Sequence, residues 1–341
     1  MNNPYSLVFG IEPSERVPRI EKKWEIVNSF LENTQRVHMI TGVRGSGKTV
    51  FMMGIRKTFQ EMEDWVTVEL STEKDMLSSL VGKLANNESL VSIFKSAKIN
   101  LSFLGFGLEI KGAAPITDTE VAVQRLLEAL KKKGKKLLVA VDEAVDNRYV
   151  REFVSVFQIL IRDEMPIYLI MTGLFENIDE LQNEKNLTFL HRAPKIPLGP
   201  LNIGTMAESY KRELKVSDDV SVKMAQLTKG YSFAFQVLGY CSWENGGDYE
   251  KALPMAKQYL EEYVYDKIWS ELSAKDKRIL YGAAKTPSGV VKEIRDFLGL
   301  GSNEFTPYKK RLIRKGIIGE ESGYARFTLP FFDRFVIENY Y

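Results

Sequence analysis

The sequence has little of the chemistry that cross-links or metal clusters require. Its one cysteine, Cys241, excludes an internal disulfide and fits a reducing compartment. Its two histidines, His38 and His191, have no partner at metal-ligand spacing, so we expect both to fill structural roles. No run approaches the ~18 apolar residues that a membrane helix needs, and Met1–Arg19 lacks the apolar stretch of a signal peptide. We therefore expect a cytoplasmic protein without a membrane partner.

An excess of either charge sign is also missing. The 341 residues include 47 lysines and arginines against 45 aspartates and glutamates, a net charge of +2. This is too small to indicate nucleic-acid binding over the whole chain, so any basic surface must be local. The length suits two or three domains, each with its own core.

Apolar runs of strand length alternate with helical patterns through the first two hundred residues. Because these runs are almost continuously apolar, they predict parallel strands covered on both faces, in an α/β fold. The predicted strands are Val37–Thr41, Trp65–Leu70, Leu137–Val141, Ile167–Thr172 and a fifth near Lys195–Leu198.

The later part of the chain has a different pattern. From Ile203 to Leu272 the periodicity is helical only, with Pro254 expected in the first turn of its helix. Three short helices then follow, and two strands around a Gly-containing turn in "IIGEESGYARFTLP". The helices are predicted over Ser273–Ala284, Gly289–Leu298 and Thr306–Lys315.

A phosphate-binding loop follows the first predicted strand. The stretch "GVRGSGKT" fits G-x-x-x-x-G-K-[ST], in which glycines let successive backbone N–H groups point at a phosphate. Lys48 supplies charge to the β- and γ-phosphates, and the Thr49 hydroxyl can coordinate Mg²⁺. A Gly-rich turn that binds nothing would not need the strand before it and the helix after it. ATP and Mg²⁺ are the predicted cofactors, and the predicted contacts in this loop are Gly42, Arg44, Gly45, Ser46, Gly47, Lys48, Thr49 and Val50.

Polar residues end two further strands. Asp142 follows Leu137–Val141, where it can hold Mg²⁺, and Glu143 can orient and deprotonate an attacking water. The same acidic pair could instead cap the following helix. Thr172 at the end of its strand could reach the γ-phosphate or the lytic water, or could be a plain strand-to-turn threonine.

With these motifs in this order, the chain resembles AAA+/STAND-class P-loop ATPases of the initiator-like and archaeal type. More specifically, it resembles a group of bacterial ATP-binding proteins of that type, and this resemblance covers almost the whole chain. It is carried by the stretches "NPYSLVFGIEPSERVPRIEKKWEIVNSFL", "TGVRGSGKTV", "FQILIRDEMPIYLIMTGL", "LTFLHRAPKIPLGPL" and "KGIIGEESGYARFTLPFFDRFV".

The resemblance implies a domain organisation and a strand order. It implies a P-loop ATPase core over 1–202 with strand order 5-1-4-3-2, a helical lid over 203–272 and a winged-helix domain over 273–341. It also implies that Phe9–Arg19 folds over the adenine, with contacts from Val17 and Arg19.

Two positions bear on how such an ATPase senses its nucleotide. Arg192 lies just before the fifth strand, where this class places an arginine that completes a neighbour's site or senses the γ-phosphate; it could also be a surface arginine or pair with Glu184 or Glu208. In the lid, "KGYSFAFQVLGY" departs from the family pattern, because Ser232 stands where a proline is usual and no arginine is present.

A basic helix and an apolar hairpin could contact other molecules. In the predicted helix Thr306–Lys315, Phe305, Tyr308 and Leu312 share one face, and the other faces are basic. These basic residues either contact double-stranded DNA or form a solvated face of a protein-docking domain. They are Lys309, Lys310, Arg311, Arg314 and Lys315. The stretch 98–112 predicts a hairpin with one apolar face that wedges DNA, contacts a neighbouring subunit or, as slightly favoured, covers the sheet.

Three functions fit these patterns. The first is an Mg²⁺-dependent ATPase whose nucleotide state moves lid and winged helix, acting on or near DNA, with Lys48, Glu143, Thr172 and Arg192 as catalytic residues. The second is a STAND-like switch that turns over slowly and signals to a protein partner. The third is a homo-oligomeric ring motor that threads a polymer and needs Arg192 to act in trans.

Overall fold

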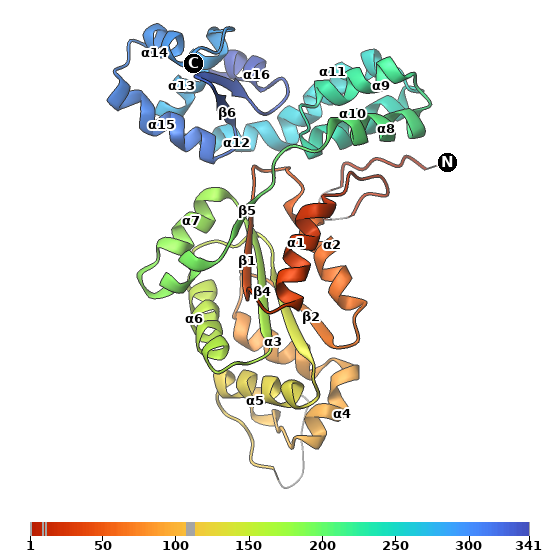
Figure 1. The fold of residues 1–341 in the computed structure, drawn as a ribbon, viewed down its shortest axis with the longest axis vertical. Helices are drawn as coiled ribbons and strands as arrows, with labels where there is room; N and C mark the ends of the chain where they lie inside the picture. Colours follow the sequence, from red (N-terminus) through yellow and green to blue (C-terminus); the bar gives the residue numbers. More distant parts are fainter. Residues whose placement is uncertain (1, 9, 11, 107–112, 341) are drawn as a thin grey trace. The chain divides into compact units, whose positions relative to one another are not determined.

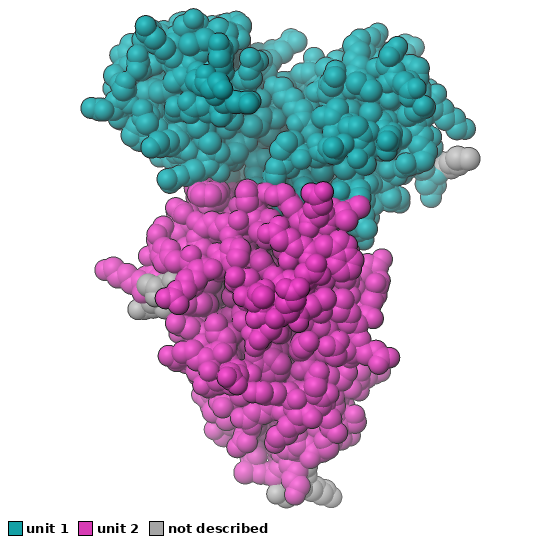
Figure 2. Space-filling view, in the orientation of Figure 1, with its two compact units in different colours: residues 1–19, 42–47, 198–341 teal, residues 20–41, 48–197 magenta. Residues whose placement is uncertain are grey.

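The chain folds into two compact units. The computed structural model describes residues 2–8, 10, 12–106 and 113–340. One unit, here called the sheet unit, comprises residues 20–41 and 48–197; the other, the helical unit, comprises residues 1–19, 42–47 and 198–341 (Figure 2). The phosphate-loop motif is therefore divided between the two units. Residues 42–47 belong to the helical unit, and Lys48 begins a helix of the sheet unit.

A five-stranded parallel sheet forms the centre of the sheet unit (Figure 1). The order β2-β3-β4-β1-β5 confirms the order 5-1-4-3-2 that the family resemblance implied. All five strands lie within one or two residues of their predicted bounds. They are β1 (Val37–Thr41), β2 (Trp65–Leu70), β3 (Lys136–Val141), β4 (Ile167–Gly173) and β5 (Lys195–Pro197).

Helices cover both faces of this sheet, which explains the continuous apolar runs. Against one face lie α1 (Ile20–Leu31) and α2 (Lys48–Gln60), with an aromatic cluster that joins Phe30, Phe59 and Trp65. The helices of the opposite face pack on the alternate side chains of the strands. They are α3 (Met76–Ala85), α5 (Thr119–Lys132), α6 (Arg148–Arg162) and α7 (Phe175–Asn183), with α4 (Glu88–Ser96) beside α3 and α5 and the 3₁₀ segment Lys185–Arg192 after α7.

The hairpin predicted over residues 98–112 is not formed in its described half. Residues 98–106 contain a 3₁₀ turn, Ser102–Leu104, that ends at Gly105 in the left-handed region. Ile99 and Leu101 are buried in the core of the sheet unit, so their alternation reflects two anchoring side chains around a turn. The second predicted arm, 107–112, lies outside the described residues.

Within the helical unit, four helices follow the last strand of the sheet in sequence; they are here called the lid helices. Their core is rich in aromatic residues and encloses Cys241. Burial raises the pKa of the Cys241 thiol to about 11. The lid helices are α8 (Ile203–Leu214), α9 (Asp218–Leu227), α10 (Ser232–Glu244) and α11 (Tyr249–Leu260); the π-helical turn Glu261–Tyr265 and α12 (Asp266–Ser270) follow.

Three helices and a two-stranded hairpin follow in the predicted order, and a further helix, which was not predicted, comes after the hairpin. Ser273 and Asp276 form a reciprocal capping box at the start of the first of these helices. The hairpin turns through Ser322 and Gly323, both in the left-handed region that a tight turn requires. The elements are α13 (Ala274–Lys285), α14 (Val291–Leu298), α15 (Ser302–Arg314), β6 (Ile318–Glu321), β7 (Tyr324–Phe327) and α16 (Phe332–Asn339).

Two prolines lie deeper in their helices than predicted. Pro254 is the sixth residue of α11, because Asp248 caps that helix by accepting a hydrogen bond from the Lys251 N–H. Pro307 is the sixth residue of α15, which begins at Ser302 rather than at Thr306. Both helices therefore lose one internal hydrogen bond past the first turn.

None of the helices in the part of the chain that the structure describes combines the length and the apolar composition that crossing a bilayer requires.

Candidate nucleotide site

Thr49 and Asp142 meet at the carboxyl-end edge of the sheet. Thr49 lies in the first turn of α2, and its Oγ1 donates a hydrogen bond of 2.8 Å to Oδ2 of Asp142, the first residue after β3. A hydroxyl and a carboxylate oxygen side by side are hard oxygen ligands of the kind that Mg²⁺ takes. No group of three or more His, Cys, Asp and Glu side chains capable of holding a metal occurs among the described residues. A metal here would thus depend on this pair together with ligand oxygens.

Thr172 and Glu143 complete this polar cluster. Thr172 is fully buried at the end of β4, and its hydroxyl donates to Oδ1 of Asp142. The Glu143 N–H lies 3.2 Å from Thr172 Oγ1 and 3.1 Å from Asp142 Oδ1. Glu143 has φ +50°, a left-handed conformation that is rare for a glutamate and is often found at functional sites. The predicted metal-holding acid and the strand-end threonine are therefore in direct contact, and the predicted base adjoins both through its backbone N–H.

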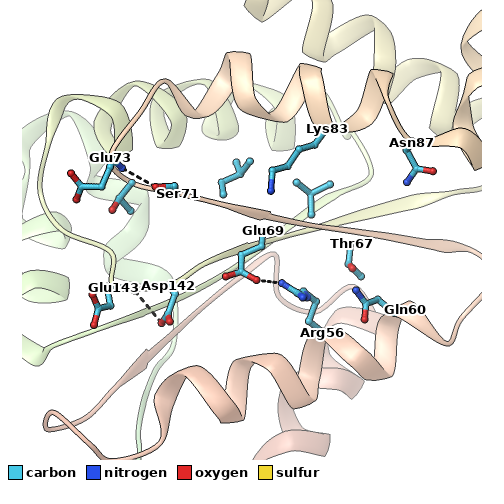
Figure 3. Close-up of a pocket in the computed structure, with 13 residues that line it drawn as sticks. Arg56, Gln60, Thr67, Glu69, Ser71, Glu73, Lys83, Asn87, Asp142 and Glu143 are labelled. Atoms are coloured by element: carbon cyan, nitrogen blue, oxygen red, sulfur yellow. Dashed lines mark hydrogen bonds and ion pairs between the residues drawn. The ribbon is translucent and has the colours of Figure 1, made fainter. Parts of the chain in front are cut away.

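Glu143 and Asp142 open onto a cavity of about 670 Å³ within the sheet unit (Figure 3). Residues of the edge strand β2 line it, and Arg56 of α2 forms an ion pair with Glu69 of β2 inside it. The side chain of Glu143 is exposed, so it can reach solvent water while its backbone is held by Thr172 and Asp142. This is the arrangement that a general base for hydrolysis needs.

The glycine loop 42–47 is shaped by its glycines and by the lid. Gly45 and Gly47 have φ of +74° and +85°, so side chains there would be strained. An added Cβ at Gly45 would lie 2.2 Å from the Tyr231 hydroxyl, which shows how closely the lid approaches the backbone. The buried Oγ of Ser46 has no hydrogen-bond partner among the described residues. These features fit a loop that curls its backbone around an anion.

Three successive carbonyl groups of this loop, at Arg44, Gly45 and Ser46, accept hydrogen bonds from the lid helices. The Tyr231 hydroxyl donates to Arg44 O at 2.6 Å, and the Phe233 N–H donates to Gly45 O at 3.1 Å. Ser232 Oγ donates to Ser46 O at 2.9 Å. Sequence reasoning missed these contacts, although the departure from the family pattern at Ser232 marked the segment that makes them.

The N-terminal residues that were expected to contact adenine also lie in the helical unit. Val17 is buried in its core, whereas Arg19 donates hydrogen bonds to the loop and to the start of α10. Phe9 and Ile11, in the same predicted segment, lie outside the described residues.

Arg192 and the two histidines are separate from the polar cluster. Arg192 is an exposed residue at the end of the 3₁₀ segment Lys185–Arg192. Its proposed partner Glu184 instead lies 3.7 Å from Arg151. His38 has the predicted structural role: it is buried under Phe30, shares a 2.6 Å hydrogen bond with Ser29, and burial lowers its pKa to about 4. His191 is exposed.

The structure divides the basic residues of α15. Phe305 and Leu312 are buried as predicted. Arg311 forms an ion pair with the buried Asp276 at 2.5 Å and also bonds Ser273, and Lys309 pairs with Glu320 at 2.8 Å. Two of the five predicted DNA contacts thus stabilise the domain itself. Lys310 and Arg314 are exposed one helical turn apart, and Lys315 is half-buried.

Two family models match separate parts of the chain. Residues 21–190 match a family model described as an ATPase domain predominantly from Archaea. Residues 262–336 match a second model, of a domain of unknown function. A search of curated proteins found no match.

Two solved structures resemble this chain over nearly its whole length. A Walker-type ATPase of Pyrococcus abyssi has a TM-score of 0.69 at 18% identity, covering 95% of this chain and 96% of that one. The ORC2 protein of Aeropyrum pernix, solved in ADPNP-ADP complexes, has a TM-score of 0.62 at 14% identity, covering 97% and 95%. At these identities the likeness shows the fold.

Proposed function

Because the chain has a P-loop ATPase core of the AAA+ initiator-like type, we propose that it binds ATP with Mg²⁺ and hydrolyses it. The observation that carries the proposal is the contact between Thr49, Asp142, Thr172 and Glu143 at one edge of the sheet. The ADPNP and ADP bound to the structurally similar ORC2 protein support nucleotide as the ligand.

Each residue of the cluster has a role that its contacts support. Lys48 supplies charge to phosphate oxygens, and Thr49 and Asp142 are the residues that would hold Mg²⁺. When bound, ATP supplies the phosphoryl group and Mg²⁺ offsets the charge of the phosphates. Glu143 accepts a proton from an attacking water, and Thr172 orients the Glu143 backbone and the Asp142 carboxylate.

We propose that nucleotide state is read by the lid and passed to the C-terminal domain. In this proposal residues 1–202 are the ATPase core, 203–272 the lid and 273–341 a winged-helix domain. Within the helical unit, Lys229 donates to Phe327 O at 3.1 Å, two residues before Tyr231 bonds the loop. The segment from Lys229 to Phe233 therefore contacts both the loop and the C-terminal hairpin.

Double-stranded DNA is the partner that we propose for the exposed face of α15, through Lys310 and Arg314. Both side chains point away from the domain core and are free of ion pairs among the described residues. Two cations one turn apart suit phosphate-backbone contact, which gives affinity without sequence preference.

The first test is steady-state ATP turnover with and without duplex DNA, with Lys48→Ala as the blank. Turnover that DNA stimulates, and that Glu143→Gln abolishes while binding persists, supports a DNA-linked ATPase. Absence of nucleotide binding in the unchanged protein refutes the proposed function.

A slow STAND-like switch with a protein partner is the second candidate. Three lid donors on successive loop carbonyls favour it, because they would slow any opening that releases nucleotide. Retention of nucleotide through purification, with negligible turnover in both conditions above, distinguishes this switch from the first candidate.

A shared site in a homo-oligomer is a further proposal, and it depends on the exposed Arg192. If Arg192 acts in trans, Arg192→Ala should depress turnover in a way that depends on protein concentration; action in cis would remove that dependence.

A further inference from the structure

Arg19 is a partly buried cation, and its hydrogen-bond partners are all uncharged. Its Nη2 donates to Gly199 O at 2.9 Å, Ser46 O at 3.2 Å and Ser232 Oγ at 3.3 Å. No carboxylate forms an ion pair with Arg19 among the described residues. Burial lowers its pKa to about 10, which reflects the cost of removing the guanidinium from water. A charge in this position is stabilised only partly by peptide and hydroxyl oxygens.

The three partners of Arg19 belong to three different segments of the helical unit. Ser46 lies in the glycine loop, Gly199 follows the last strand of the sheet, and Ser232 begins α10. The Ser46 carbonyl accepts from both Arg19 and Ser232, so the N-terminal segment, the loop and the start of α10 meet at one oxygen atom.

Arg19 also lies against the next residue of the loop. A Cβ added at Gly47 would lie 3.7 Å from Arg19 Nη1 and 3.3 Å from Ser232 Oγ. The guanidinium is therefore close to the backbone between Ser46 and Gly47, just before Lys48. A negative charge held by this part of the loop would offset the charge of Arg19.

We propose that Arg19 is a positioning residue that couples phosphate binding to the lid: its guanidinium ties the Ser46 carbonyl to the first turn of α10, and bound phosphate stabilises it there. The inference rests on the proposed nucleotide-binding function and assigns to Arg19 a role distinct from contact with adenine. Arginine suits the task because its planar fork reaches several acceptors at once while staying charged. Since the lid has no arginine at its expected sensor position, Arg19 supplies the cation from the N-terminal segment instead.

Coupling of this kind is reciprocal. If phosphate stabilises the joint between loop and lid, then the closed joint must strengthen nucleotide binding by the same factor. Removing Arg19 should therefore weaken the nucleotide and, separately, abolish the response of the lid to it.

The test uses the full chain, ADP as the probe and two variants of Arg19. Arg19→Gln removes the charge but keeps amide donors, and Arg19→Lys keeps the charge but loses the fork. Arg16→Gln is the matched control, because Arg16 lies in the same segment, is more exposed and pairs with Glu12. The two readouts are ADP affinity by calorimetry and hydrogen exchange of residues 231–236 with and without ADP.

We expect Arg19→Gln to weaken ADP at least tenfold and to lose the ADP-dependent protection of residues 231–236. Arg19→Lys should recover part of the affinity but little of the protection, and Arg16→Gln should match the unchanged protein. A merely structural role would instead raise exchange without ADP and leave the ADP-induced change intact.

Two results overturn the inference while leaving the proposed function standing: ADP affinity of Arg19→Gln within twofold of the unchanged protein, or an unchanged protective response to ADP. If the unchanged protein binds no ADP, the proposed function fails and this inference fails with it. Should Arg19→Gln not fold, Ser232→Ala removes one partner of the same joint, and an unaltered lid response in that variant overturns the inference.

Discussion

Polar groups occupy different places in the two units. In the sheet unit the strands are almost wholly apolar, and Thr172, Asp142 and Glu143 gather at the strand ends. In the helical unit polar atoms lie inside the core. Tyr210, Tyr231 and Tyr265 donate their hydroxyl groups to backbone carbonyls of other segments, at 2.9, 2.6 and 2.6 Å.

This difference means that the groups that stabilise the sheet unit are not the polar groups proposed to act on its ligand. Apolar packing holds the sheet unit together, so the polar residues at its edge can be arranged for a ligand. In the helical unit directional hydrogen bonds fix which segments meet, because a buried hydroxyl or carbonyl without a partner is costly. Substitutions should therefore have different effects in the two units.

The largest expected effect is on turnover, in the sheet unit. Glu143→Gln should lower ATP turnover about 10²–10⁴-fold, since it removes the proposed general base. Nucleotide affinity and the unfolding midpoint should stay close to their original values, because the Glu143 side chain is exposed. Phosphate release measures the rate, and Glu73→Gln, a carboxylate of the same cavity, is the control. Equal loss in both variants would contradict the assignment.

A stability effect of intermediate size is expected at His38. Its pKa is about 4 in the folded protein and about 6.5 in the unfolded chain, so the unfolded state binds more protons between these values. The stabilisation by neutral His38 is complete above pH 6.5 and is lost as the pH falls toward 4, by about 3 kcal/mol. His38→Asn removes this titration.

Urea unfolding of both proteins from pH 7.5 to pH 4 measures the difference. The free energies of unfolding of His38→Asn and the unchanged protein should converge as the pH falls. Parallel curves would show that His38 is not the titrating group.

A smaller loss of stability is expected in the core of the helical unit. Tyr265→Phe should lower the free energy of unfolding by about 1–2 kcal/mol, because the buried Pro330 carbonyl loses its partner. Tyr324→Phe, at an exposed tyrosine, should change it by less than about 0.5 kcal/mol. Chemical denaturation measures the free energy of unfolding of both variants. Similar losses in the two variants would show that the buried hydroxyl group of Tyr265 does not stabilise the helical unit in particular.

The smallest effect on stability is expected on the surface of α15. Replacing both Lys310 and Arg314 with alanine should change the free energy of unfolding by less than about 0.5 kcal/mol. If these residues contact DNA phosphates, affinity should fall and the slope of log affinity against log salt should decrease by about 2. Unaltered DNA binding would exclude this face of the helix as the interface.

The sheet and its polar edge were predictable because their determinants are local. Each strand is a short apolar run with a turn signal after it, and the phosphate-loop motif fixes its own backbone through glycines. The order of the strands is a tertiary property, and it came from the family resemblance alone. Contact among Thr49, Asp142 and Thr172 followed from the rule that parallel strands end at one edge.

The features that were missed depend on contacts between distant segments. Nothing near Ser46 in the sequence indicates that Ser232 and Arg19 share its carbonyl. Likewise, the basic pattern of α15 does not reveal that Arg311 pairs with Asp276. The alternation at Ile99 and Leu101 looks the same for a strand and for two anchors around a turn. In each case tertiary burial decides the outcome.

The buried thiol of Cys241 makes this chain convenient for following its own motions. With a pKa of about 11, only about one thiol in 10⁴ is ionised at pH 7, so thiol reagents should hardly modify it. Since it is the only cysteine in the chain, a new cysteine placed on an exposed position would react alone. Spectroscopic probes can therefore be attached to either unit without first replacing the native residue.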